Sequence, residues 1–186
     1  MLTHTLGFPR IGVNRELKKA QEAYWKGTIG EAELLATARE LRRRHWDLQR
    51  EAGVDLVPVG DFSLYDHVLD TIAMIGAVPE RFGAPPPQVD TALYFRMARG
   101  DRNAAAMEMT KWFDTNYHYI VPEFRAGMEF RLSTTRLLEE VEEARTAGVR
   151  AKAVVLGPLS LMLLGKEVEP GFDRWTLLDG VLEVYE

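Results

Sequence analysis

Cysteine is absent from this chain of 186 residues. Its absence excludes disulfide bonds, thiolate nucleophiles and zinc sites built on cysteine ligands from this chain. The four histidines, His4, His45, His67 and His118, lie far apart in the sequence, and none forms an HxxxH pair. The sequence therefore predicts that this chain binds no metal.

Long apolar runs are also missing. No stretch approaches the roughly 20 apolar residues that a membrane-spanning helix requires, and the opening MLTHTLGFPR lacks the apolar segment of a secretory signal. We therefore expect a cytoplasmic protein without a membrane partner. The formal net charge of -5 argues against non-specific binding to nucleic acid, although it leaves room for a local basic patch.

The composition is that of a globular domain, with 46% hydrophobic and 27% charged residues. No GxGxxG or GxxxxGK[ST] motif follows a predicted strand, which argues against a dinucleotide site and a P-loop. No serine, histidine and acid form a recognisable nucleophile elbow. The Pro-rich stretch 83–88 is interpreted as a surface excursion within one domain.

Strand and helix patterns alternate along the chain, which predicts an α/β fold with a parallel sheet. Four such units are half of an eight-unit barrel, and the apolar helical pattern still runs at the final VLEVYE, as expected for a segment of a larger protein. The predicted strands are 3–6, 54–62, 117–122 and 152–158, and the predicted helices are 14–26, 31–52, 63–75, 92–99, 134–147 and from 173 onward.

Arg15 and Lys18 form the first candidate site. They are three residues apart, so they share a face of a helix for which Asn14 is the predicted N-cap. Cations at the positive end of a helix dipole stabilise little, but they suit an anionic ligand that approaches this end. The alternative is a solvated face on which Lys18 pairs with Glu22.

Lys111 and Asn116 form the second candidate site, on either side of Trp112 and Phe113. Their donors and acceptor could face a cleft beside the predicted strand 117–122. Alternatively, both aromatic residues belong to the core and Lys111 extends past them to solvent.

The remaining polar clusters are predicted to be mainly structural. Acid–base chemistry at the end of the second strand is weighed against helix capping by Asp61 or Ser63, and capping is favoured. His45 is predicted to be a core or boundary histidine. The cluster at the end of the second strand comprises Asp61, Tyr65, Asp66 and His67. Two charged runs are predicted to be solvated faces: the basic residues 42–44 and the glutamates Glu139, Glu140, Glu142 and Glu143.

Four segments resemble the family of cobalamin-independent methionine synthase, the 5-methyltetrahydropteroyltriglutamate–homocysteine methyltransferase. They are GFPRIGVNRELKKAQEAYW, RRRHWDLQREAGVDLVPVGDFSLYDHVLD, AAAMEMTKWFDTNYHYIVPEF and KAVVLGPLSLMLLGK. Together with the sequence between them, the resemblance covers essentially all 186 residues.

The resemblance implies a fold of two (β/α)8 barrels of the TIM type, with residues 1–186 as roughly the first half of the N-terminal barrel. It implies that a methyl group passes from 5-methyltetrahydropteroyltriglutamate to homocysteine. Zinc, held by His, Cys, Glu and Cys, would activate the homocysteine thiolate in the C-terminal barrel, which this chain lacks. No catalytic residue or bound cofactor is therefore expected here, and the isolated chain is expected to be inactive.

The resemblance assigns this chain to the polyglutamate tail of the folate. Arg15 and Lys18 would bind its carboxylates, whereas Glu16 and Leu17 would act through backbone and packing. Lys111 and Asn116 fall in the second contact region. The folate-binding residues that the resemblance implies are thus Arg15, Glu16, Leu17, Lys18, Lys111 and Asn116.

Two other functions compete with this hypothesis. A stand-alone half-barrel could bind or support other molecules without catalysis, and it would self-associate through its open sheet edge. A different reaction on a related barrel, such as a decarboxylation, is the weaker alternative, since the sequence shows no active-site residues for it.

Overall fold

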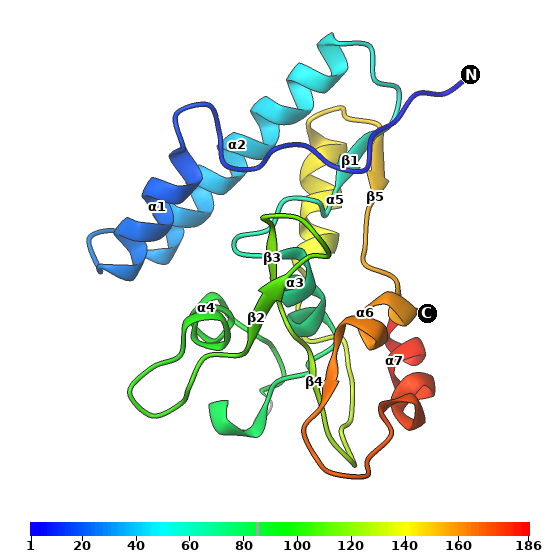
Figure 1. The fold of residues 1–186 in the computed structure, drawn as a ribbon. Helices are drawn as coiled ribbons and strands as arrows, with labels where there is room; N and C mark the ends of the chain where they lie inside the picture. The colour runs from blue at the N-terminus through cyan, green and yellow to red at the C-terminus, as the bar shows by residue number, and fades with distance from the viewer. Residues whose placement is uncertain (85) are drawn as a thin grey trace. The chain divides into compact units, whose positions relative to one another are not determined.

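The computed structural model describes residues 1–84 and 86–186 (Figure 1). Position 85, within the predicted surface excursion, lies outside the described residues. The chain divides into two compact units, residues 1–64 with 136–155 and residues 65–135 with 156–186. Each unit is described by itself.

The first unit is built on a short parallel sheet between β1 (Val57–Val59) and β5 (Ala151–Ala153). A single parallel bridge from His4 to Leu56 adds the N-terminal segment beside β1. Its helices are α1 (Glu16–Trp25), α2 (Glu31–Glu51) and α5 (Arg136–Thr146), and α1 lies alongside α2 (Figure 1).

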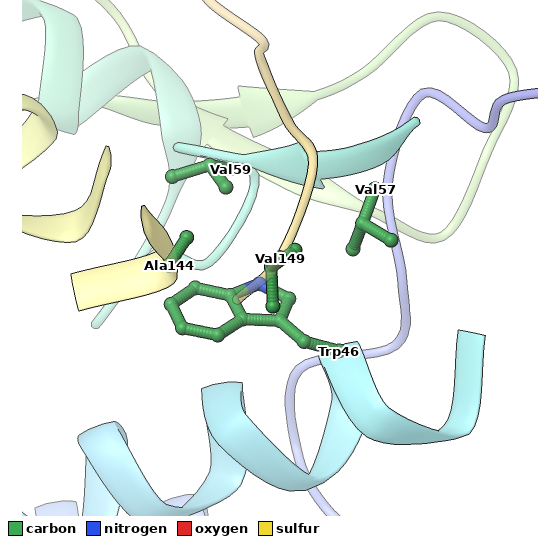
Figure 2. Packing of buried hydrophobic residues seen from close by; sticks show 5 residues of the cluster. All are labelled: Trp46, Val57, Val59, Ala144 and Val149. Carbon is green, nitrogen blue, oxygen red and sulfur yellow. The ribbon is translucent and has the colours of Figure 1, made fainter. Parts of the chain in front are cut away.

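The core of the first unit forms around Trp46. Its indole, from the buried face of α2, packs with Val57 and Val59 of β1 and with Ala144 and Val149 (Figure 2). All five side chains are buried. Apolar residues from α2, β1, α5 and the residues before β5 thus share one cluster, so the 3.6-residue periodicity of both helices is satisfied against the sheet.

The second unit contains an antiparallel hairpin and a short parallel pair. In the hairpin, β2 (Met109–Lys111) pairs with β3 (His118–Ile120), with Lys111 opposite His118. In the other pair, β4 (Glu123–Phe124) runs parallel to β6 (Lys166–Glu167). The helical segments are α3 (His67–Met74), η1 (Glu80–Phe82), α4 (Thr91–Arg99), α6 (Pro158–Leu164), η2 (Arg174–Leu177) and α7 (Leu178–Tyr185).

The predicted mixed α/β class is confirmed, whereas the predicted series of four parallel strands is not what the structure shows. The described residues form three two-stranded sheets and no closed barrel. Segment 3–6 makes only the bridge at His4, and strand β3 pairs with the unpredicted β2 in antiparallel fashion. Segment 152–158 was predicted to be a buried strand, but its pairing with β1 ends at Ala153, and Val155, beyond that pairing, is about half exposed.

Two predicted helix starts were also wrong. Helix α1 begins at Glu16 with Arg15, not Asn14, at the N-cap. Helix α3 begins at His67 and is capped by Asp66 rather than by Asp61 or Ser63. Among the described residues, no helix is long and apolar enough to cross a membrane.

Candidate anion-binding site

The first candidate group lies at the start of α1. Arg15 occupies the N-cap in the left-handed conformation, with φ 60° and ψ 36°, and its side chain is exposed. This conformation is uncommon for a residue with a Cβ. Lys18 follows three residues later on the exposed face. The helix therefore begins with a cation at each of these positions, as the sequence predicted.

Glu16 and Leu17, between these cations, are held by the protein itself. One Glu16 oxygen, Oε2, accepts the Asn14 backbone N–H at 2.8 Å, and the other, Oε1, accepts from Arg44 at 2.7 Å. The hydrogen bond from Arg44 lowers the pKa of Glu16 below its usual value, so its carboxylate is ionised at neutral pH. Leu17 is fully buried, and its N–H donates to Ile11 at 3.1 Å.

Lys18 makes the pairing that the alternative interpretation proposed. Its Nζ lies 3.7 Å from Glu22 Oε1, one helical turn further along. Both side chains are about half exposed. An ion pair that exposed contributes little free energy, so a carboxylate ligand can replace Glu22 at small cost.

The second candidate group lies on the hairpin of β2 and β3. Lys111 ends β2 and Asn116 lies in the connection to β3, and both are exposed. Local hydrogen bonds order the connection: the Trp112 N–H donates to the Tyr117 carbonyl at 2.7 Å, and the His118 side chain donates from Nδ1 to the Asn116 carbonyl at 3.0 Å. The hairpin thus presents Lys111 and Asn116 from a fixed turn.

Aromatic rings support one side of this hairpin. The Trp112 ring makes edge contacts with His67 at 4.9 Å, Tyr119 at 5.8 Å and Phe113 at 5.3 Å between ring centroids. Phe113 is 75% exposed and has φ 50°, so the interpretation that both aromatic residues are core is wrong for Phe113. The exposure of Phe113 could not be predicted from the sequence, because large aromatic residues are usually largely buried.

Asp66 links α3 to this hairpin, a structural role that the sequence did not assign to it. Its carboxylate accepts the N–H groups of Val68 at 3.0 Å and Leu69 at 2.9 Å as the cap of α3, and also the N–H of Ile120 in β3 at 3.1 Å. Burial raises the pKa of Asp66 to about 6, although these hydrogen bonds oppose the shift, and nearby Asp70 raises it further. Capping was therefore the right prediction on the wrong residue.

The other clustered polar residues also have structural contacts. Asp61 accepts the Phe8 N–H at 2.8 Å, and burial raises its pKa. His67 Nδ1 lies 3.1 Å from the Tyr117 hydroxyl, on the α3 side of the hairpin. His45 is buried as predicted, with its ring 4.8 Å from that of Phe8, and desolvation lowers its pKa.

The structure brings the predicted residues together in two groups. Arg15, Glu16, Leu17 and Lys18 belong to the first unit, and Lys111 and Asn116 belong to the second. Across residues 1–84 and 86–186, no three His, Asp or Glu side chains are placed to hold a metal ion. What the two groups share chemically is exposed positive charge beside hydrogen-bond donors, which suits carboxylates or phosphates.

These observations define a mixed α/β protein with exposed cations at a helix start and on a hairpin. The family model described as "Cobalamin-independent synthase, N-terminal domain" matches residues 2–186, and the chain belongs to this family. The resemblance found in the sequence is thereby confirmed.

Three relatives carry the name 5-methyltetrahydropteroyltriglutamate–homocysteine methyltransferase. The protein of Syntrophotalea carbinolica is 63% identical over 189 residues, which cover 100% of this chain and 25% of the relative. Those of Nitrosomonas europaea and Photorhabdus laumondii are 59% and 58% identical, covering 99% and 100% of this chain and 24% and 25% of themselves. The chain therefore spans about a quarter of the length of the curated relatives it matches.

Proposed function

We propose that this chain is part of a methyltransferase that moves the methyl group of 5-methyltetrahydropteroyltriglutamate to homocysteine and so makes methionine. Within that enzyme it supplies contacts to the triglutamate tail of the folate and supports the barrel scaffold. The names of relatives that match the whole chain support the reaction. The exposed cations Arg15, Lys18 and Lys111 support the assignment to the tail.

The proposal also covers the barrel to which this segment belongs and the cellular compartment in which the enzyme acts. Residues 1–186 form roughly the first half of an N-terminal (β/α)8 barrel, and the enzyme acts in the cytoplasm like other enzymes of amino-acid biosynthesis. Zinc and the homocysteine thiolate belong to the part of the enzyme beyond this segment. The sequence is compatible with that division, because this chain has no cysteine to supply the Cys ligands that the resemblance implies.

The chemistry of the tail fits the two groups of residues. Each glutamate of the tail carries a carboxylate, and Arg and Lys bind carboxylates through charge-assisted hydrogen bonds. The Asn116 side chain adds donors and an acceptor for the amide links between glutamates. Because the cations are exposed, each contact is weak by itself, and the attraction must fall with added salt.

The decisive observation is that Arg15 and Lys18 are exposed at the start of α1, where cations contribute little to helix stability. Calorimetric titration of the full chain with 5-methyltetrahydropteroyltriglutamate tests the proposal. We expect salt-sensitive binding that the double variant Arg15→Ala/Lys18→Ala loses. The matched control Lys19→Ala/Lys26→Ala removes the same charge from exposed positions on and just after α1 and should bind as the parent does.

A chimera covers the case in which the tail is held only by the complete enzyme. Residues 1–186 replace the matching quarter of the Syntrophotalea carbinolica protein, and the Michaelis constant for the folate is measured. The substitutions Arg15→Ala/Lys18→Ala and Lys111→Ala should raise it, whereas Arg102→Ala should not. A Michaelis constant that none of these changes moves would refute the assignment to the tail.

The alternative is a stand-alone half-barrel that binds or supports other molecules without catalysis. It predicts that the chimera is inactive although it folds, and that the chain does not bind the triglutamyl folate. An active chimera with the expected change in Michaelis constant therefore decides between the two functions.

A further inference from the structure

The backbone of Arg15 is held in a conformation that the residue does not favour. Among the described residues, Arg15 and Phe113 are the non-glycine residues with positive φ. A left-handed residue with a Cβ is strained unless its surroundings hold it. At Arg15 the N-cap has no side-chain capping bond of its own, so the restraint must come from its neighbours.

Glu16 supplies that restraint from one side. Its Oε2 accepts the Asn14 N–H at 2.8 Å, so this hydrogen bond joins the two residues on either side of Arg15. The Arg15 N–H donates to the Gly12 carbonyl at 3.1 Å, which closes the turn. At Gly12, where φ is 83°, a Cβ would collide with the Glu16 carboxylate and would lie 2.8 Å from Leu41. Glycine is therefore required for Glu16 to occupy this position.

Arg44 holds Glu16 from the other side. Its Nη2 donates to Glu16 Oε1 at 2.7 Å and reaches from α2, 28 residues further along the chain. The Glu16 carboxylate thus joins α2 to the Asn14 N–H. If Arg15 were released into the right-handed conformation, it would continue the helix, and its side chain would leave the backbone in another direction.

We propose that Arg44 is a positioning residue for the contact between Arg15 and the folate tail, acting through Glu16 and the Asn14 N–H. The inference rests on the proposed function, because it assumes that Arg15 meets the glutamate carboxylates. It assigns to Arg44 no contact with the ligand.

Arg44 also neutralises a charge that the site cannot leave unpaired. Glu16 lies between Arg15 and Lys18 in the sequence, and its pKa is lowered, chiefly by the Arg44 hydrogen bond. Without Arg44, an ionised carboxylate beside the two cations would repel the glutamates of the tail. Loss of Arg44 therefore acts on the ligand through both geometry and charge.

Arg44 uses only part of its guanidinium in this contact. Its Nε is buried without a hydrogen-bond partner in the part of the chain that the structure describes. A buried donor without an acceptor is unfavourable. The hydrogen bond from Nη2 to Glu16 is therefore the contact through which Arg44 would act on the turn at Arg15.

The test compares Arg44→Met with Arg43→Met in the full chain. The two substitutions remove the same charge from neighbouring positions of α2, and Arg43 is exposed. Binding of 5-methyltetrahydropteroyltriglutamate is measured by calorimetry. We expect Arg44→Met to bind roughly tenfold more weakly, as for the loss of one charge-assisted hydrogen bond, and Arg43→Met to bind as the parent does.

A double-mutant cycle separates positioning from general destabilisation. If Arg44 acts largely through Arg15, Arg44→Met causes a clearly smaller loss of affinity in an Arg15→Ala background than in the parent, and the remainder measures the repulsion by the unpaired Glu16 carboxylate. An equal loss in both backgrounds would overturn the inference while leaving the proposed tail site intact. If Arg15→Ala itself leaves binding unchanged, the proposed site fails instead.

Amide hydrogen exchange provides a measurement that needs no ligand. In Arg44→Met, the Asn14 amide should exchange faster, while amides in the middle of α2 keep their protection. Unchanged protection at Asn14 would show that Arg44 does not hold this turn, whatever the ligand does. Faster exchange throughout the first unit would show a merely structural role and would overturn the inference equally.

Discussion

Arg42 of α2 and Glu140 of α5 form an ion pair of 3.3 Å in which Glu140 is buried and Arg42 is largely buried. The Arg42 side chain is 11% exposed and that of Glu140 is 4% exposed. Arg42 also reaches Glu143, one turn further along α5, at 2.5 Å. One guanidinium from α2 therefore bridges two carboxylates of α5, beside the Trp46 cluster.

Substitution of Glu140 should destabilise the first unit. Glu140→Ala leaves Arg42 buried with a single carboxylate partner, and we expect a loss of about 3 kcal/mol in the free energy of unfolding. The control is Glu142→Ala on the same helix, whose pairing with Arg145 is exposed, and it should have little effect. Denaturant unfolding of both variants measures the difference, and equal midpoints would contradict the prediction.

This ion pair also shows what the sequence could and could not predict. The periodicity of the sequence predicted the positions of α2 and α5, because a helical period follows from local sequence. The runs 42–44 and 139–143 were interpreted as solvated, since a sequence shows charge but not which partner lies 101 residues away. The prediction of solvated faces was therefore wrong for Arg42 and Glu140, because no local pattern encodes the tertiary contact between them.

The second unit shows the same limit at Asp66 and at the hairpin. Asp61, Ser63 and Asp66 are all suitable caps before α3, and the sequence alone does not show where the loop ends. Strand β2 is three exposed residues long and has no apolar alternation, so periodicity could not detect it. The sequence could predict that Arg15 and Lys18 lie at the start of a helix, since charge and helical period are both local, whereas their role toward a ligand stays a prediction.

Asp66 should contribute more to stability than an ordinary N-cap. In Asp66→Ala the N–H groups of Val68, Leu69 and Ile120 lose their acceptor, and the last belongs to buried Ile120 in β3. We expect a loss of roughly 2 to 3 kcal/mol in the free energy of unfolding. Asp90→Ala is the matched control, because Asp90 caps α4 through the N–H of Leu93.

The position of the loss identifies its cause. Faster amide exchange at Ile120 in Asp66→Ala would show that the hairpin is released from α3. If Asp66→Ala costs no more than Asp90→Ala and Ile120 stays protected, the link between the cap and β3 contributes nothing.

The pH dependence of stability should carry the signature of Asp66. Its pKa rises from 3.8 to about 6 on folding, so the folded state binds the proton more tightly than the unfolded state. The contribution of Asp66 is therefore complete below pH 4 and is lost as the pH rises through about 6, by roughly 3 kcal/mol in total. His45, whose pKa is lowered, acts with the opposite sign as the pH falls through its usual range.

The difference between the parent and Asp66→Asn isolates this effect, since His45 contributes equally to both. Unfolding free energies measured between pH 4 and pH 8 should diverge across this window and become parallel above it. Curves that stay parallel throughout would show that Asp66 keeps an ordinary pKa in the folded protein.

Phe113 should be replaceable by a residue that tolerates its backbone. Its φ is 50° and its ring is 75% exposed, so little buried surface is lost when the ring is removed. Asparagine adopts the left-handed conformation more readily than phenylalanine. Phe113→Asn should therefore raise the unfolding free energy by about 0.5 to 1 kcal/mol, less the edge contact with Trp112.

Comparison with alanine separates the backbone strain at positive φ from the loss of the ring contact with Trp112. Phe113→Ala loses the same ring contact but keeps the preference against positive φ, so it should be less stable than Phe113→Asn. Thermal unfolding of both variants decides the order, and the reverse order would show that backbone strain at this position contributes little to stability.

The full chain should self-associate, because its short sheets leave strand edges available and its surface carries apolar side chains. Leu159 and Leu163 lie one turn apart on α6 and are 55% and 65% exposed, so they form one apolar strip.

Sedimentation velocity should show a weight-average mass that rises with concentration. The variant Leu159→Gln/Leu163→Gln should reduce that rise, whereas Leu132→Gln, at a single exposed leucine in a loop, should not. A chain that remains monomeric at high concentration would contradict the prediction, and an unchanged rise in the double variant would assign the association to the strand edges instead.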